Sequence, residues 1–301
     1  MLEARTLSGL REACAALRAG GRGLGLVPTM GALHAGHAAL IAAARDAGVA
    51  AAASIFVNPL QFAPDEDLAR YPRDEAADLH RLAQAGCDLA WLPDAATMYP
   101  PGSATYVEVA GPALRWEGER RPGHFRGVAS VVARLFGQVR PDLACFGEKD
   151  WQQLQVVRRM VQDLHLPVRI IGVPTLREPD GLALSSRNRF LSPAERRTAP
   201  LLSAVLAEAA AALARGEPVD PMLDLAGARL GAAGFAVEYL ALVDGTGLEP
   251  AATPEPGARL IAAARLGPVR LIDNVGVCAK EEGQGLRPLD PRWGRAPDPF
   301  T

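Results

Sequence analysis

The sequence predicts an α/β protein with a doubly wound parallel (Rossmann-like) sheet and a second, smaller α+β C-terminal domain. In the first part of the chain, short apolar runs alternate with stretches of helical periodicity, which is typical of βαβ units. After about residue 177 this alternation ends, and helical stretches are followed by three strand-like runs. The chain has 301 residues, of which 49% are hydrophobic, enough to form two modest cores.

In the first part, apolar residues recur at helical spacing from Leu7 to Leu17, and Gly20-Gly21 then favours a helix end. The run at 50–57 is continuously apolar, as expected for a strand buried on both faces of a parallel sheet. Further strands are expected at 24–27, 88–92, 143–146 and 168–173, and further helices after His37 and at 74–84, 127–139 and 151–164.

In the second part, Ser192-Pro193-Ala194-Glu195 fits a capping box with proline at the first helical position, which predicts the start of one long Ala/Leu helix. A further helix is expected near 222–230, then antiparallel strands at 236–243, 259–264 and 269–272. The predicted domains are therefore 1–176, a Rossmann-like ligand-binding domain, and 177–280, a smaller domain that forms a lid. Residues 281–301 lack apolar periodicity and are expected to be a disordered tail.

Composition excludes several classes of protein. With 32 basic and 34 acidic residues the net charge is −2, which argues against an extensive nucleic-acid surface. No uninterrupted apolar run reaches the roughly 20 residues that a membrane span needs, and the N-terminus does not resemble a secretory signal. The cysteines are far apart and mostly in apolar surroundings, which is typical of buried thiols in a reducing compartment, so a cytoplasmic location is expected: Cys14, Cys87, Cys145 and Cys278.

The most informative segment joins the first predicted strand to the following helix. The strand ends in a Pro28 turn, and then come Gly31 and His34-Ala35-Gly36-His37 at the start of the helix. Two imidazoles and several free main-chain N–H groups at the positive end of a helix suit the phosphates of a nucleotide. A zinc half-site is the alternative, but the remaining ligands are hard to find, and a purely structural role is the other.

Polar side chains follow the next strands at the edge where open α/β sheets bind ligands. Asn58 and Gln61 place amides just beyond the buried strand, where they could bind a small hydroxy acid. The alternative for this segment is a proline-initiated turn with solvated amides.

The segment from Gly147 to Gln153 carries the second set of polar groups. Gly147 permits close approach of a ligand, Lys149 can offset phosphate charge, and Asp150 can cap a helix or hold a metal ion. Gln153 lies three residues after Asp150, on about the same helical face. A simple capped helix is the alternative.

Two basic segments complete the candidates. Leu184 to Asn188 offers two hydroxyls and a guanidinium, which suit a mobile clamp on phosphates. Arg120 to Gly127 contains three arginines and a histidine that could attract anionic substrates. Solvated surface loops are the alternative for both.

Taken in order, these motifs resemble the pantothenate synthetase (pantoate–β-alanine ligase) family, within the nucleotidyltransferase superfamily that has a His-x-x-His-like motif. The serine-arginine loop beside Gln61 and Gln153 favours this branch. Trp151 stands where tyrosine is common and Ala35 where an acidic residue is frequent, and neither removes a group that the mechanism needs. The resemblance rests on Pro28 to His34, Gly36-His37, Ser54 to Phe62, Tyr71-Pro72-Arg73, Phe146 to Asp150 with Gln152-Gln153, and Leu184 to Asn188.

The resemblance implies a C–N bond-forming, AMP-forming ligase. ATP and pantoate would give pantoyl adenylate and pyrophosphate, and β-alanine would then give pantothenate and AMP. It implies Mg²⁺ with ATP and a homodimer, without nucleic-acid or membrane partners. The nearest alternative is another small-molecule adenylyl- or cytidylyltransferase, which would not need the Gln61 and Gln153 pair.

The resemblance also implies site residues. His37 would be the proton donor, and the implied catalytic set is His34, His37, Lys149 and Arg187. Gln61, Gln153 and Asn58 would bind pantoate and β-alanine; the metal ligands are open, with Asp150 a candidate. The implied ATP-binding residues are Met30, Gly31, Ala32, Leu33, His34, Ala35, Gly36, His37, Gly147, Glu148, Lys149, Asp150, Leu176, Leu184, Ser185, Ser186 and Arg187.

Overall fold

The computed structural model describes residues 1–62, 68 and 71–277. They form two compact units, one made of 1–148 with 152–174 and the other of 149–151 with 175–277. We call them the first unit and the second unit, and we describe each by itself. The change of unit after Pro174 is close to the domain boundary expected at residue 176. The tail expected at 281–301 lies outside the described residues.

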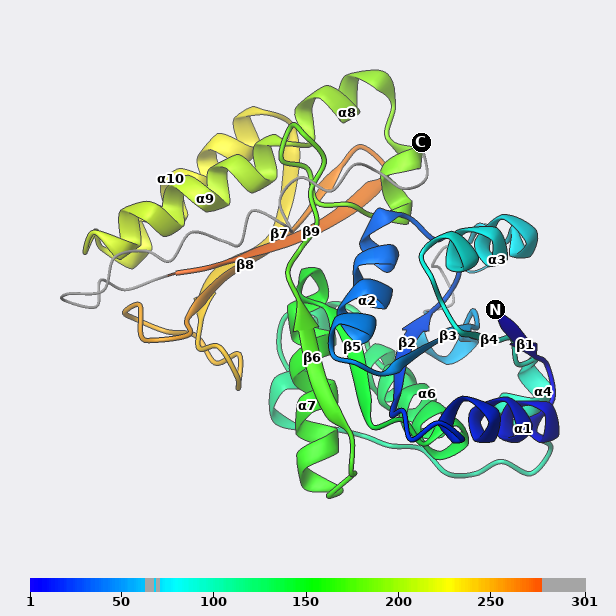
Figure 1. Cartoon of the computed structure of the whole chain (residues 1–301). Coiled ribbons are helices and arrows are strands. Elements are labelled where there is room, and N and C mark those ends of the chain that lie inside the picture. Colours follow the sequence, from blue (N-terminus) through cyan, green and yellow to red (C-terminus); the bar gives the residue numbers. More distant parts are fainter. Residues whose placement is uncertain (63–67, 69–70, 278–301) are drawn as a thin grey trace. The chain divides into compact units, whose positions relative to one another are not determined.

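The first unit is built on a six-stranded parallel sheet, which confirms the predicted fold class (Figure 1). The hydrophobic pattern of the sequence does not predict β1, because three residues are too few to show a periodicity. The strands, in the spatial order β1-β4-β3-β2-β5-β6, are β1 (Leu2–Ala4), β2 (Leu24–Thr29), β3 (Ala50–Ile55), β4 (Leu89–Trp91), β5 (Leu143–Gly147) and β6 (Arg169–Val173).

Several helices of the first unit begin at a residue whose side chain caps the first turn. Thr6 caps the first helix and Asp74 the third, each accepting a hydrogen bond from a main-chain amide of the first turn. The sixth helix begins at His124, three residues before the predicted start. The helices are α1 (Leu7–Arg18), α2 (Ala35–Asp46), α3 (Glu75–Gln84), α4 (Ala95–Met98), α5 (Glu117–Arg120), α6 (His124–Val139) and α7 (Trp151–Asp163).

Strands β2 to β5 are buried on both faces of the sheet, and successive residues of each strand alternate between the faces. On one face, Val27, Ala53 and Cys145 pack with apolar residues of α2 and α3 in a single core cluster. On the other face, Trp91 is fully buried, and its Nε1 donates to Gln138 Oε1 on α6 at 3.0 Å. Burial on both sides explains why the strands read as continuous apolar runs.

The strand order places the candidate turns. The chain runs outward from β2 through β3 to β4 and then returns to add β5 on the other side of β2. The connections that follow β2 and β5 therefore leave in opposite directions. Open α/β sheets bind ligands at such a place, at the carboxyl ends of the two strands. Residues 30–37 follow β2 directly, and Gly147 ends β5.

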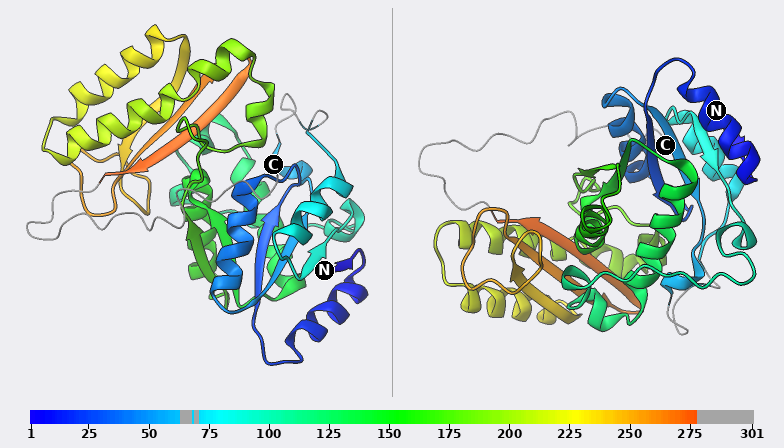
Figure 2. Two further views of the ribbon diagram at one scale, coloured as in Figure 1. Left: turned by 45° about the horizontal axis from the view of Figure 1, so that its top comes forward. Right: turned by 90° about the horizontal axis from the view of Figure 1, so that it is seen from below.

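The second unit has a three-stranded antiparallel sheet in the order β7-β8-β9, as predicted. Figure 2 shows its two long helices side by side over one face of the sheet, where they bury a common core. Its elements are α8 (Pro193–Thr198), α9 (Leu201–Ala214), α10 (Val219–Ala232), β7 (Phe235–Val243), β8 (Arg259–Leu266) and β9 (Val269–Gly276).

The expected single long helix after Ser192 is wrong, because the chain forms two helices there. The capping box predicted at its start is present, with reciprocal hydrogen bonds between Ser192 and Glu195. Pro200 lies between α8 and α9. It has no main-chain N–H to continue the hydrogen-bond ladder, which ends the first helix.

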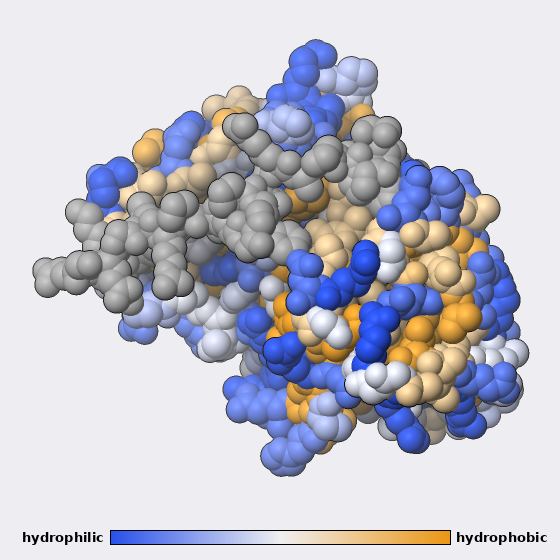
Figure 3. Space-filling view, viewed as in Figure 1, coloured by the Kyte–Doolittle hydropathy of each residue, from blue (hydrophilic) through white to orange (hydrophobic). Residues whose placement is uncertain are grey.

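Within the described residues, Pro193–Ala214 is long and apolar enough to cross a membrane by length and composition alone. Its α9 portion contributes Leu202, Leu206 and Leu213 to the core of the second unit. Over α9 and α10 the surface intersperses hydrophilic with hydrophobic residues (Figure 3). The apolar character of this segment is therefore accounted for by its packing inside the second unit.

Candidate active site

Residues 30–37, which we call the histidine turn, join β2 to α2. The expectation that several of their main-chain N–H groups are free is wrong for most of the turn. The amide of Gly31 donates to Thr29 Oγ1 at 3.2 Å, and the amide of Gly36 donates to His34 Nδ1 at 3.1 Å. Residues 31–33 are buried, so side chains satisfy main-chain groups there that water cannot reach.

Helix α3 supplies a further pair of contacts. Asp78 is 2% exposed, and its two carboxylate oxygens accept hydrogen bonds from the amides of Ala32 and Leu33, each at 2.8 Å. One turn along α3, Arg81 donates to the carbonyl oxygen of Leu33 at 3.0 Å. Helix α3 thus holds the main chain of Ala32 and Leu33, two residues predicted to bind ATP. The side chains of both are buried.

The hydrogen bonds of the histidine turn define how both imidazoles can act. His34 is the N-cap of α2, and its main-chain amide donates to His37 Nδ1 at 3.1 Å. Because Nδ1 is an acceptor in both rings, each neutral ring carries its proton on Nε2. The ring centroids are 4.2 Å apart. Two neighbouring Nε2–H donors at a helix N-terminus are suited to bind phosphate oxygens.

The amide of Asn58 is buried and uses its hydrogen-bonding groups inside the protein. Its Nδ2 donates to Gln61 Oε1 and to the carbonyl of Gly127, both at 3.1 Å. Its Oδ1 accepts from the amide of Leu60 at 3.2 Å and from the hydroxyl of Tyr99 at 2.8 Å. Burial raises the pKa of Tyr99 to about 12, so this hydroxyl stays protonated as a donor. Asn58 is thus placed to orient Gln61.

Gln61 is held from its main chain as well as from its side chain. Its carbonyl oxygen lies 3.3 Å from Arg121 Nη2 and 2.9 Å from His124 Nδ1, and its Nε2 lies 2.8 Å from the sulfur of Met30. The basic segment at the start of α6 therefore packs on the Gln61 turn.

The two glutamines at the start of α7 differ in environment. Gln152 is 6% exposed, and its side chain bonds to the main chain of Pro112, Arg115 and Glu117 at 2.8–3.0 Å. Gln153 is only partly buried. Gln152 thus fixes the segment before α6, and Gln153 is the glutamine with an accessible side chain.

Gly147 has no steric reason within the described residues to be glycine. A Cβ at this position would meet no heavy atom within 4 Å, and its φ is not positive. Asp150, the candidate metal ligand, is 48% exposed at its side chain and lies 3.9 Å from Lys149 Nζ. No cluster of three metal-ligating side chains occurs among the residues that the structure describes.

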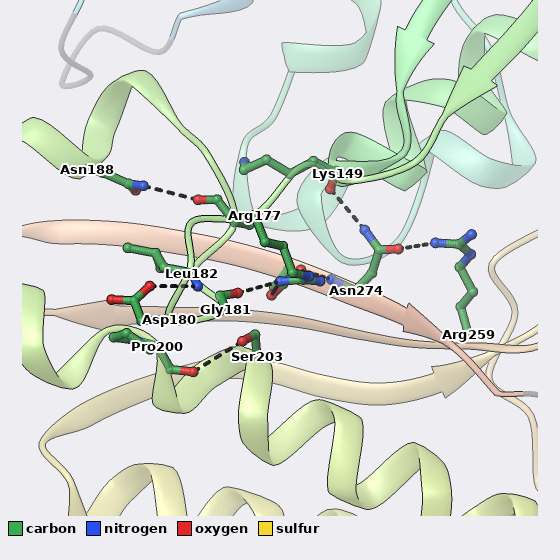
Figure 4. Close-up of polar contacts among 12 residues, drawn as sticks. Lys149, Arg177, Asp180, Gly181, Leu182, Asn188, Pro200, Ser203, Arg259 and Asn274 are labelled. Atoms are coloured by element: carbon green, nitrogen blue, oxygen red, sulfur yellow. Dashed lines mark hydrogen bonds and ion pairs between the residues drawn. The ribbon is translucent and has the colours of Figure 1, made fainter. Parts of the chain in front are cut away.

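Lys149 belongs to the second unit and is fixed there through its main chain (Figure 4). Its carbonyl oxygen accepts a hydrogen bond from Asn274 Nδ2 on β9 at 3.0 Å. Arg259 on β8 donates to Asn274 Oδ1 and places its guanidinium 3.5 Å from the ring centroid of Trp151. The segment around Lys149 is therefore attached to the small sheet by a hydrogen bond and a cation–π contact.

The neighbouring residue on β9 holds the loop that precedes the predicted clamp segment. Asp273 is 4% exposed and binds the Arg177 guanidinium at 2.7 and 2.9 Å, a two-point ion pair. Arg177 also donates to the carbonyl of Gly181 at 3.1 Å (Figure 4). The amide of Leu184 donates to the carbonyl of Leu176 at 3.0 Å, so 176–184 closes on itself.

The serine-arginine segment follows this closed loop. Ser185 caps the short helical segment Ser186–Phe190 by accepting the amide of Arg187 at 3.3 Å. Arg196 on α8 donates to Asp180 at 2.6 Å and thereby lowers the pKa of Asp180, which stays ionised at neutral pH. These contacts give the segment a defined conformation in the second unit, and its role as a clamp stays a prediction.

Three supporting residues, Asp78, Asp273 and Asn274, were missed from the sequence. Asp78 reads as one more polar residue on an amphipathic helix, and Asp273-Asn274 as polar residues near the end of a strand. The only signal was a polar pair at the end of an apolar run. Their importance comes from partners far away along the sequence, main-chain groups for Asp78 and Asn274 and a guanidinium for Asp273, which no local pattern can show.

Comparison with known proteins gives one consistent result. The family model described as pantoate-beta-alanine ligase matches residues 3–276. A pantothenate synthetase of Acidiphilium cryptum is 61% identical over 274 residues, covering 91% of this chain and 99% of that protein. One from Granulibacter bethesdensis is 58% identical, with coverages of 91% and 96%.

Solved structures agree with the sequence relatives. The crystal structure of pantothenate synthetase from Thermus thermophilus has a TM-score of 0.87 at 50% identity, covering 92% of this chain and 99% of that one. The pantoate-beta-alanine ligase of Francisella tularensis, complexed with beta-gamma ATP and beta-alanine, has a TM-score of 0.78 at 32% identity, with coverages of 91% and 97%.

The Asp273–Arg177 pair predicts a measurable stability difference. Asp273→Asn leaves Arg177 without its charge partner, and since the side chain of Arg177 is 30% exposed we expect a loss of about 3 kcal/mol, at the low end for a broken buried pair. Glu75→Gln, in an exposed pair with Arg5, should cost less than about 1 kcal/mol. Urea denaturation followed by circular dichroism measures both, and equal losses would contradict the assigned role.

Proposed function

The chain belongs to the pantoate–β-alanine ligase family and is a ligase that joins pantoate to β-alanine with the use of ATP; from this premise we propose how its own residues divide the work. Pantoate and ATP give pantoyl adenylate and pyrophosphate, and the amine of β-alanine then displaces AMP to form the amide bond. The single observation that carries the assignment is the pair of Nε2–H imidazoles at the start of α2.

The first step brings a carboxylate to a phosphorus atom that is surrounded by negative oxygens. Donors aimed at the developing charge lower this barrier most. We assign His34 and His37 to the phosphates, with His37 as the donor at the reacting phosphate. Gly147 supports the assignment of the nearby main chain to ATP, because the protein itself leaves room at this position that a side chain would fill.

Gln61 and Gln153 are assigned to pantoate, with Gln61 also near β-alanine. Neutral amides can bind the hydroxyl and carboxylate groups of pantoate without adding charge. The four hydrogen bonds of Asn58 support a role in orienting Gln61 in place of the direct substrate contact implied by the resemblance.

In the second unit, Lys149, Ser185, Ser186 and Arg187 are assigned to the phosphates of ATP, and Leu176 and Leu184 to its surroundings. Lysine and arginine offset the charge of departing pyrophosphate, and serine hydroxyls add hydrogen bonds. The anchoring of Lys149 by Asn274 supports this, because a fixed main chain limits where the ammonium can lie. Closure of this segment would shield the adenylate from water.

Magnesium is assigned as an ion that arrives with ATP. Mg²⁺ in such sites is held by one or two carboxylates together with substrate phosphates, and the exposed Asp150 fits one such ligand. A cytoplasmic location and a homodimer complete the proposal.

The order of product release tests the reaction. With ATP and pantoate together, pyrophosphate should appear in about one equivalent per enzyme, and AMP should appear only after β-alanine is added. Quenched-flow samples resolved by chromatography measure both products. Release of AMP before β-alanine is present would contradict the adenylate sequence.

His37→Ala should slow pyrophosphate formation by roughly 10²-fold or more, as expected for loss of a donor to a developing charge. The matched control is His165→Asn, at an exposed histidine with φ 50, a conformation that asparagine tolerates. A single-turnover pyrophosphate assay compares the two. Unchanged turnover in His37→Ala would assign this histidine to structure alone.

Gln153→Ala should raise the KM for pantoate at least about tenfold more than the KM for ATP, since only the pantoate contact is removed. Gln152→Ala is the matched control: it removes three internal hydrogen bonds and should lower the melting temperature. Steady-state kinetics and thermal denaturation separate them. Equal changes in the KM values for pantoate and ATP in Gln153→Ala would contradict the assignment of Gln153 to pantoate.

A further inference from the structure

We propose that Asp78 is a positioning residue for ATP: it acts through the main chain of the histidine turn and does not touch the substrate. The inference rests on the proposed function of that turn. Its basis is the two-point contact of one buried carboxylate with two consecutive amides, those of Ala32 and Leu33, at 2.8 Å each. Because Ala32 and Leu33 lead directly into His34, the N-cap of α2, their path decides where both imidazoles lie.

The backbone held by Asp78 has a conformation that it would not adopt by itself. Gly31 and Ala32 have φ values of 82 and 51, two consecutive residues in the left-handed region. A non-glycine residue is unfavourable there and persists when its surroundings hold it. A Cβ on Gly31 would lie 2.7 Å from Asp78 Oδ2, so the glycine and the carboxylate fit each other.

Helix α3 holds the same turn at a second point. Arg81 lies three residues after Asp78, on about the same face of the helix, and donates to the carbonyl of Leu33. Leu33 is thus bound at its N–H by an acceptor and at its C=O by a donor, both from α3. The next residue, His34, begins the bonds that set the tautomers of the two rings.

Two other roles for Asp78 fit less well. As a metal ligand it would need accessible oxygens, but its residue is 2% exposed and both oxygens already accept main-chain hydrogen bonds. As a group beside a triphosphate, a carboxylate adds repulsion, so its benefit to ATP binding must come from geometry. A role in stability alone would leave the affinity for each substrate unchanged, which an experiment can detect.

The test compares Asp78→Asn with Asp88→Asn. Asp88 also accepts a main-chain hydrogen bond, from Ala51 at 2.8 Å, but at the amino end of β3, away from the histidine turn. Asparagine has one acceptor oxygen, so at position 78 one of the two amides faces an NH₂ group. We expect the KM for ATP to rise at least about tenfold in Asp78→Asn, with the KM for pantoate within about twofold, and neither to change in Asp88→Asn.

A spectroscopic readout accompanies the kinetics. In protein labelled with ¹⁵N-histidine, the Nδ1 and Nε2 shifts of His34 and His37 should move away from the Nε2–H pattern in Asp78→Asn and stay in place in Asp88→Asn. Arg81→Met loosens the other contact on Leu33 and should raise the KM for ATP about threefold. This second variant decides the question if Asp78→Asn does not fold.

The outcomes separate the inference from the function on which it rests. Asp78→Asn could lower the melting temperature while leaving the KM for ATP and the ¹⁵N chemical shifts of both histidines at their wild-type values. That result would overturn the positioning role. The same result together with a strong loss in His37→Ala would leave the proposed function intact. If His37→Ala keeps full activity, the assignment of the histidine turn itself is wrong.

Discussion

The hydrogen bonds that main-chain amides make inside the histidine turn are the constraint on which the candidate site depends. A buried amide needs an acceptor, and here the acceptors are a carboxylate on α3 and a threonine hydroxyl. The partly buried amides of His34 and Gly36 donate to the Nδ1 atoms of the two imidazoles. Satisfying the backbone in this way leaves Nε2 as the proton-bearing atom of each ring. The hydrogen bonds of the backbone thereby fix which atom of each neutral imidazole is a donor, the atom that the proposed function assigns to a phosphate.

In the second unit, too, a few buried side chains hold the main chain or side chains of other segments. Adjacent residues of β9, Asp273 and Asn274, bind two segments that are far from each other along the chain. One holds the arginine at the start of the closed loop 176–184, and the other holds the carbonyl of Lys149. A small antiparallel sheet with a helical cover on one face thus supports the main chain of Lys149, which is assigned to ATP, and the loop that precedes the serine-arginine segment.

Much of the fold was predictable because its signals are local. Apolar runs marked β2 to β6, helical spacing marked α1, and a capping box marked the start of α8. The failures also have local causes: β1 is too short to show a period, and Pro200 interrupts a pattern that composition alone reads as one helix. Residues 63–67, 69–70 and 278–301, including Cys278 and the expected tail, lie outside the described residues.

For the candidate site, the sequence by itself determined which chemical groups are present and in what order, from the histidine pair through Gln61 and Lys149 to the serine-arginine segment. It also indicated the family, because these motifs in this order resemble those of the pantoate–β-alanine ligases. Only the tertiary structure decided how each group is used. The side chain of Asn58 makes its hydrogen bonds inside the protein, Gln152 bonds to the main chain, and Asp78 holds the histidine turn. The physical reason is that local patterns reveal the type of side chain, whereas several hydrogen-bond partners of Asp78, Asn58 and Gln152 come from segments 35 to 69 residues away.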